Sequence, residues 1–260
     1  MDEAPQTWHY GLVARWWAEN NLDGREIAIF RPFVETGQPA LDAGCGTGRL
    51  LIPYLKAGLD VDGADISGDM LALCRERAER EGLRAPNLYA QALSALDLPR
   101  RYRTILVCGA FGLGSERADD VEALRRLYEH LEPGGTLVLD NEVPWSVGYW
   151  ECWPKGARAD LPRPWPDEGD RLGDIELCSR LVALDAFEQT VTLEMRAVLW
   201  EDGRRAREEE HLLTMRLYFV HELELMLELA GFVDVELRAG YRDEPPANDD
   251  DFVVYVARRP

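Results

Sequence analysis

The sequence has few cysteines, few basic residues and no long apolar run. Its five cysteines are odd in number and show no CxxC spacing, which argues against a disulfide framework or a structural zinc site and fits a reducing cytoplasm. No segment approaches the roughly 20 apolar residues that span a bilayer, and Met1–Gln6 is too acidic to begin a signal peptide. We therefore expect a cytoplasmic protein with no metal site and no membrane partner.

The charge balance is strongly acidic. Lys and Arg number 29 against 48 Asp and Glu, which gives a formal net charge of -19. Such a surface repels polyphosphate, so we expect no nucleic-acid partner. With 46% hydrophobic residues in 260, the chain is typical of one folded domain covering residues 1–260. Residues 1–38 are expected to form an N-terminal helical cap on it.

Between residues 40 and 140 short apolar runs alternate with amphipathic segments. This order predicts βαβ units, a parallel sheet and right-handed crossovers. The expected strands are Ala40–Ala43, Val61–Asp65, Asn87–Ala90, Thr104–Cys108 and Thr136–Asp140. The expected helices are Leu50–Ala57, Ser67–Glu81 and Asp119–Leu131. The pattern favours an α/β protein with a Rossmann-like, doubly wound, mostly parallel sheet.

The alternation of strands and helices ends at residues 144–220, which we expect to form a substrate-side insertion. Tryptophans gather among prolines at positions 145, 150, 153 and 165, which indicates an irregular segment able to line an apolar pocket or to form a dimer contact. Antiparallel strands are expected at Ile175–Leu184, Thr190–Trp200 and Glu208–Phe219, with an Asp-Gly hairpin turn at 202–203. A helix at Val220–Ala230 and strands at Val233–Arg238 and Phe252–Ala257 complete an expected seven-stranded sheet with an added antiparallel β insertion.

The strongest local signal is the segment Leu41-Asp42-Ala43-Gly44-Cys45-Gly46-Thr47-Gly48, between a strand and a helix. Its glycines permit positive φ and a close approach of the backbone to a ligand. A dinucleotide site would have GxGxxG, whereas here the spacing is GxGxG with Asp42 two residues before the first glycine. A pyrophosphate disfavours a nearby carboxylate, but a methionine ammonium needs an acceptor that Asp42 can supply.

This segment resembles the first motif of class I S-adenosylmethionine (SAM)-dependent methyltransferases, (D/E)xGxGxG. The family also places an acid at the end of the second strand, on the ribose hydroxyls, and Asp65 stands there. Leu131-Glu132-Pro133-Gly134-Gly135 resembles the LxPGG element before the fifth strand. The resemblance covers roughly residues 40–140. It implies SAM as cofactor and a small-molecule methyl acceptor.

The resemblance implies cofactor residues in the glycine loop, at the end of the second strand and after the third and fourth strands. These are Asp42, Gly44, Cys45, Gly46, Gly48, Asp65, Ile66, Met70, Ala92, Leu93, Cys108 and Phe111. Ile66 and Met70 would pack near the adenine. Phe111 would face the sulfonium through a cation–π contact or belong to the core, two interpretations of equal weight. The family's acid after the third strand is missing, with Gln91 as the alternative partner of the adenine.

The acceptor pocket is expected at Asn141, Trp145, Trp150 and Tyr218. No (N/D)PP(Y/F) motif follows the fourth strand, which argues against adenine or glutamine nitrogen as acceptor. In-line SN2 transfer depends on alignment and needs a general base only for a protonated acceptor. If a base is needed, the candidate catalytic residues are His9, Tyr10 and His221. The segment of His9 is expected to close over the cofactor.

Two alternatives stay open at this point. An NAD(P)-dependent oxidoreductase shares the fold and the acid after the second strand. A non-catalytic SAM-binding interaction protein would use the aromatic insertion as its interface. The choice among N-, O- and C-methylation, and the existence of a homodimer, are not decided by the sequence.

Overall fold

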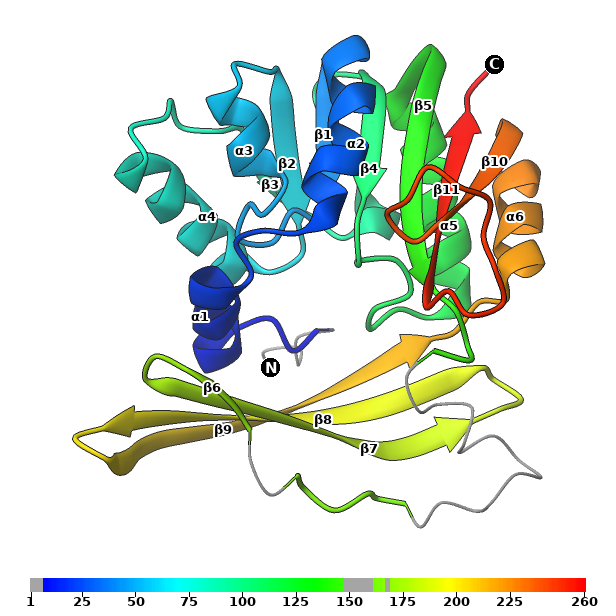
Figure 1. Ribbon diagram of the computed structural model, residues 1–260. Helices are drawn as coiled ribbons and strands as arrows, with labels where there is room; N and C mark the ends of the chain where they lie inside the picture. The colour runs from blue at the N-terminus through cyan, green and yellow to red at the C-terminus, as the bar shows by residue number, and fades with distance from the viewer. Residues whose placement is uncertain (1–6, 147–160, 167–168) are drawn as a thin grey trace.

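The chain folds into two layers of sheet with helices around the first layer (Figure 1). The computed structural model describes residues 7–146, 161–166 and 169–260. One sheet has seven strands and the other has four, and an isolated bridge between Leu113 and Met215 joins them. The space between the two sheets is where the glycine loop, the N-terminal segment and helix α1 meet.

The seven-stranded sheet has the order β10-β11-β5-β4-β1-β2-β3. Strands β1 to β5 run parallel to one another, whereas β11 is antiparallel to both β5 and β10. The predicted doubly wound, mostly parallel sheet of seven strands is therefore confirmed. Its strands are β1 Ala40–Ala43, β2 Val61–Asp65, β3 Leu88–Ala90, β4 Tyr102–Val107, β5 Leu131–Glu142, β10 Val233–Ala239 and β11 Phe252–Arg258.

Helices cover both faces of this sheet because each carries an apolar stripe. Helices α5 (Arg117–His130) and α6 (Val220–Leu229) pack on one face with a short 3-10 turn, η1 (Leu93–Ala95). Helices α2 (Arg25–Thr36), α3 (Leu51–Lys56) and α4 (Gly68–Arg80) pack on the other. The hydroxyl of Ser67 accepts a hydrogen bond from the amide of Met70 at 3.2 Å, so Ser67 is the N-cap of α4.

The four-stranded sheet is a layer of its own, not an extension of the parallel sheet. Its strands are β6 Asp170–Leu172, β7 Ile175–Asp185, β8 Thr190–Glu201 and β9 Arg204–Arg216. Helix α1 (Gly11–Asn20) packs on it through an apolar cluster that includes Trp8, Leu12 and Val13. The Asp-Gly turn is confirmed, since Asp202 and Gly203 both have positive φ, at 49° and 73°.

Three predicted strand boundaries were wrong by three residues or more, and one of them is the end of β9, which lies at Arg216 instead of Phe219 because Phe219 is the N-cap of α6. Strand β9 begins at Arg204 instead of Glu208, because its pairing with β8 starts at Glu201↔Arg204, directly after the turn. Strand β5 begins at Leu131, before the Pro-Gly-Gly element, since Leu131 already pairs with Tyr102 of β4. Among the residues that the structure describes, no helix is long and apolar enough to cross a membrane.

Candidate active site

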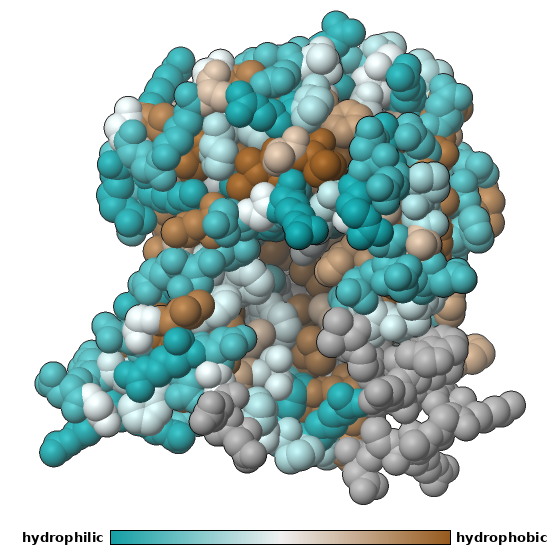
Figure 2. Space-filling view, viewed as in Figure 1, coloured by the Kyte–Doolittle hydropathy of each residue, from teal (hydrophilic) through white to brown (hydrophobic). Residues whose placement is uncertain are grey.

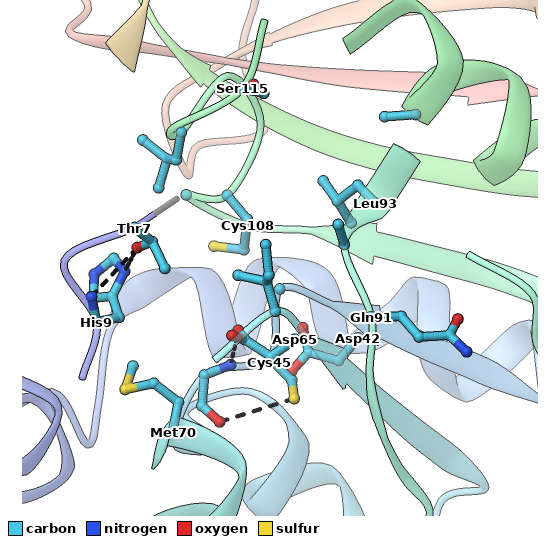
Figure 3. Close-up of a pocket in the computed structure, with 18 of the residues that line it drawn as sticks. Thr7, His9, Asp42, Cys45, Asp65, Met70, Gln91, Leu93, Cys108 and Ser115 are labelled. Atoms are coloured by element: carbon cyan, nitrogen blue, oxygen red, sulfur yellow. Dashed lines mark hydrogen bonds between the residues drawn. The ribbon is translucent and has the colours of Figure 1, made fainter. Parts of the chain in front are cut away.

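A cavity of about 250 Å³ lies at the carboxyl ends of β1, β2 and β4. This is the switch point of the sheet, where ligands bind in open α/β folds. The space-filling view shows the molecule hollowed between its two sheets (Figure 2), and Figure 3 shows the wall of the cavity from inside. Of the predicted cofactor residues, the lining includes Asp42, Gly44, Cys45, Gly46, Asp65, Ile66, Met70, Ala92, Leu93 and Cys108.

The glycine loop folds tightly against the end of β2. Gly44, with φ of +87°, cannot accept a side chain because a Cβ atom would lie 2.3 Å from Cβ of Ala110. The amides of Gly44 and Cys45 donate to the carbonyl of Ala64, at 2.7 and 3.0 Å. These amides are therefore not available to a pyrophosphate, which needs several free N–H groups.

Asp65 organises the same loop from the end of β2. Its Oδ2 accepts from the amide of Gly46 at 2.9 Å (Figure 3), and its Oδ1 accepts from the amide of Ser67 at 2.8 Å. Burial raises the pKa of Asp65, and the two amide bonds act in the opposite direction. The carboxylate is thus fixed in orientation, and its other lone pairs can accept two ribose hydroxyls.

Asp42 is the unusual acid of the site. It is 2% exposed and lines the cavity, yet its Oδ2 is buried with no hydrogen-bond partner among the described residues. Burial, and next the charge of Asp65, raise the pKa of Asp42 to about 7. An acceptor left unpaired in this way requires a donor from a ligand, and an ammonium group would also restore the carboxylate to its charged form.

The cation nearest the loop is already neutralised. Arg49 lines the cavity, but its guanidinium forms an ion pair with the buried carboxylate of Glu26 and donates to Sγ of Cys108 at 3.6 Å. Cys108 in turn donates to Asp140 at 3.0 Å. Since no cation of the described residues pairs with Asp42 or Asp65, the cavity favours a positively charged ligand over a phosphate.

These residues fit SAM, whose ammonium and sulfonium groups are both cationic. Residues 40–135 match the family model described as a methyltransferase domain. The chain is 24% identical over 220 residues to a protein of Geobacillus sp. (strain WCH70) named as a methyltransferase, covering 84% of this chain and 83% of that one. It is 40% identical over 133 residues to the demethylmenaquinone methyltransferase of Thermus thermophilus, covering 50% of this chain and 55% of that one.

The similarity extends to the whole fold. The structure of the CcbJ methyltransferase from Streptomyces caelestis matches with a TM-score of 0.70 at 25% identity, covering 91% of this chain and 94% of that one. This chain is a class I SAM-dependent methyltransferase. Its membership decides against the alternative of a nicotinamide oxidoreductase.

The N-terminal segment of the methyltransferase forms part of the cavity wall. Thr7 and His9 line it, and the carbonyl of His9 accepts from the hydroxyl of Ser67, beside Asp65. The Nδ1 atom of His9 lies 2.7 Å from the hydroxyl of Thr7, and its Nε2 accepts from Nε1 of Trp8 at 2.9 Å. Burial lowers the pKa of His9 to about 4. His9 is therefore neutral at pH 7, with both ring nitrogens engaged.

The other two predicted catalytic residues lie away from the cavity wall. Tyr10 packs its ring against His211, with ring centroids 4.2 Å apart. His221 is largely exposed on α6, and its Nδ1 contacts Glu224 at 2.8 Å. The structure gives Tyr10 a packing role between α1 and β9 and gives His221 a surface contact with Glu224.

Phe111 and Gly48 are corrections to the predicted cofactor set. Phe111 is 5% exposed, packs against Tyr218 in the core and does not line the cavity, because the loop after β4 turns its ring toward α5 and α6. Gly48 also lies outside the lining. Its φ is +84°, and a Cβ atom at this position would lie 2.8 Å from side-chain atoms of both Cys74 and Ile52, so it is a packing glycine.

The predicted acceptor residues are placed elsewhere as well. Tyr218 is fully buried and donates to Asp120 at 2.6 Å, while the amide of Asn141 donates to the carbonyl of Glu142 at 2.8 Å. Trp145 packs against Phe219, with ring centroids 6.3 Å apart. None of the three lines the cavity, because each side chain is taken up by a neighbour in the protein. Trp150 lies outside the described residues.

Much of the lining was not predicted from the sequence. It consists of Thr7, Trp17, Asn21, Thr47, Arg49, Leu50, Gln91, Ser94, Gly109, Ala110, Gly112, Leu113, Ser115, Asp119, Asp120 and Ala123. Only Thr47, within the glycine segment, and Gln91 had been singled out from the sequence. Asp119 and Asp120 begin α5, which packs against η1 directly after β3. They bring carboxylates to the side of the cavity where the family's acid after the third strand is missing.

Proposed function

We propose that this methyltransferase transfers the methyl group of SAM to a nitrogen or oxygen atom of a small molecule. The observation that carries the proposal is the composition of the cavity wall. Residues after β1, β2 and β4 share one space of about 250 Å³ with Thr7, His9 and Trp17 of the N-terminal segment. A space closed from that side admits a compact acceptor and excludes a folded macromolecule.

The proposed chemistry relies on alignment. SAM would supply an electrophilic methyl group on a sulfonium. As a lone pair of the acceptor forms the new bond to the methyl carbon in line, the carbon–sulfur bond would break and S-adenosylhomocysteine would leave. The residues of the loop after β4, from Gly109 to Leu113, lie beside Cys108, and all but Phe111 line the cavity. They would hold the acceptor at this edge. Alignment of two bound reactants accounts for a large part of the barrier in reactions of this type.

A side-chain base is not part of the proposal. His9 is neutral at pH 7, but its Nε2 already accepts a hydrogen bond from Trp8, so it cannot take a proton without breaking that bond. A primary or secondary amine that binds in its neutral form needs no base before transfer. Asp119 also lines the cavity, and its charge favours an amine over an alcohol or phenol as the acceptor.

We further propose that the protein works in the cytoplasm, without a nucleic-acid substrate. Four cysteines, Cys45, Cys74, Cys108 and Cys178, are free thiols in the structure, which suits a reducing compartment. The net charge of -19 opposes binding to a polyanion. A homodimer, and the division into an N-terminal cap at 1–38 and an insertion at 144–220, remain predictions.

The test is transfer of a labelled methyl group from SAM. The protein is incubated with labelled SAM and, separately, with a metabolite extract that passes a macromolecular filter, with total RNA and with total protein. We expect label in a compound of the metabolite fraction, and none with the Asp65→Ala variant. Label in RNA or protein alone would refute the small-molecule acceptor, and a non-catalytic SAM-binding protein would label none of the three fractions.

A further inference from the structure

One buried donor in the cavity wall has no partner within the described part of the protein. The indole Nε1 of Trp17 is inaccessible to solvent and makes no hydrogen bond among the described residues. The indoles of Trp8, Trp16 and Trp200 each donate, to His9, to the carbonyl of Asp170 and to Glu176 respectively. Buried N–H groups in folded proteins are nearly always paired, and Trp17 lines the cavity. Its missing partner is therefore to be sought in a ligand.

The position of Trp17 indicates which part of the ligand its N–H group contacts. Trp17 lies in the last turn of α1, and its carbonyl accepts from the amide of Asn21, which also lines the cavity. The chain then passes directly into α2, where Glu26 pairs with Arg49 after the glycine loop. Trp17, Asn21 and Arg49 line the same cavity as Asp42 and the glycine loop.

The amino-acid end of SAM is a zwitterion, and the two charges require different partners. The unpaired Oδ2 of Asp42 suits the ammonium. The carboxylate would be repelled by Asp42 and Asp65 unless N–H donors offset the repulsion. Trp17 offers such a donor, and the guanidinium of Arg49 belongs to the same cavity wall.

We propose that Nε1 of Trp17 binds the carboxylate of the amino-acid moiety of SAM. The proposal rests on the cofactor and not on the proposed acceptor. It assigns to α1, outside the residues 40–135 that match the family model, a direct contact with the cofactor. Because Asp42 belongs to β1 and Trp17 to α1, the cofactor would tie α1 to the glycine loop.

The experiment compares two ligands in two matched variants. Isothermal titration measures S-adenosylhomocysteine (SAH) and 5′-methylthioadenosine, which keeps the nucleoside and the thioether but has no amino acid. Trp17→Phe keeps an aromatic ring beside His9, whose centroid is 5.6 Å from that of Trp17, and removes the N–H. Trp16→Phe removes the neighbouring indole N–H, which donates to Asp170 and does not line the cavity.

We expect Trp17→Phe to weaken SAH roughly 10- to 100-fold, as for loss of a hydrogen bond to a charged group. The affinity of Trp17→Phe for 5′-methylthioadenosine should stay within about twofold of the wild-type value, and Trp16→Phe should change the affinity for neither ligand. Equal weakening of both ligands, or unchanged SAH affinity with a raised KM for the methyl acceptor, would overturn the proposal. Failure of the wild-type protein to bind SAH would overturn the cofactor assignment with it.

A ligand-side comparison keeps the test decisive if Trp17→Phe folds poorly. Decarboxylated SAH retains the ammonium and lacks only the carboxylate. The wild-type protein should bind it roughly tenfold or more weakly than SAH, and Trp17→Phe should lose that preference. Equal affinity of the wild-type protein for the two ligands contradicts a carboxylate contact.

Discussion

Cofactor binding should depend on pH through Asp42. In the ligand-free protein burial raises the pKa of Asp42 to about 7, and its Oδ2 has no partner among the described residues. A ligand ammonium beside this carboxylate favours the ionised form and lowers its pKa. Binding of SAH therefore requires ionised Asp42, and it releases a proton when binding takes place below pH 7.

The magnitude follows from the pKa. With a value of about 7, Asp42 is about three-quarters ionised at pH 7.5 and about 3% ionised at pH 5.5. The affinity for SAH should fall about 25-fold over this interval. In the unfolded chain the same group ionises near 3.8, so rising pH favours unfolding of the ligand-free protein between pH 4 and 7. The difference corresponds to about 4 kcal/mol, which bound SAH would offset.

Isothermal titration of SAH at pH 5.5, 6.5 and 7.5, in buffers of different ionisation enthalpy, gives both the affinity and the number of protons released. Asp42→Asn is the matched control, because the amide keeps the shape and cannot ionise. The variant should show a much shallower pH dependence, while any titration of the ligand itself remains. A slope in Asp42→Asn equal to that of the wild-type protein would refute the role of Asp42.

Three further changes test other parts of the site. Asp65→Ala should reduce SAH affinity at least about 100-fold by titration, because several charge-assisted hydrogen bonds are lost; unchanged affinity would contradict the ribose contact. Gly44→Ala should abolish SAH binding, because the added Cβ atom would lie 2.3 Å from Cβ of Ala110. Gly58→Ala is the control. Gly58 also has positive φ but open space around it, so the free energy of unfolding by denaturant should fall by only about 1 to 2 kcal/mol. Tyr218→Phe should lower the free energy of unfolding by about 1 to 3 kcal/mol, because it removes a buried donor to a carboxylate, and should leave the acceptor KM unchanged; a raised KM would restore Tyr218 to the acceptor pocket.

The fold was predictable where its signals are local. The helix that Ser67 caps and the turn at Asp202-Gly203 are determined by a few adjacent residues, and both lie where the sequence places them. The start of β9 depends on pairing with β8 and not on its own apolar pattern, because Arg204–Arg207 is polar apart from one alanine. Its first four residues were therefore missed.

The same distinction applies to the site. The glycine loop follows β1 and Asp65 ends the neighbouring strand β2, so the sequence placed both at one edge of the sheet. The hydrogen bond from the Gly46 amide to Asp65 was not predicted. The contact of Ser67 with the carbonyl of His9 joins residues 58 positions apart, and no local pattern announces it. Trp17 could be recognised as an amphipathic helix residue, but its unpaired Nε1 is a property of the folded cavity.

Two buried acids on neighbouring strands show why Asp42 is assigned to function and not to structure. Asp62 of β2, 1% exposed, accepts from Arg100 at 2.8 Å, from Asn87 at 2.9 Å and from Tyr102 at 3.0 Å. A buried carboxylate that serves the fold is satisfied in this manner, since an unpaired one is costly. Asp42 is equally buried, and no cation of the described residues pairs with it. We propose that the partner of its Oδ2 is the ammonium group of the cofactor, so that the carboxylate that destabilises the protein at neutral pH would give the site selectivity for a cationic ligand.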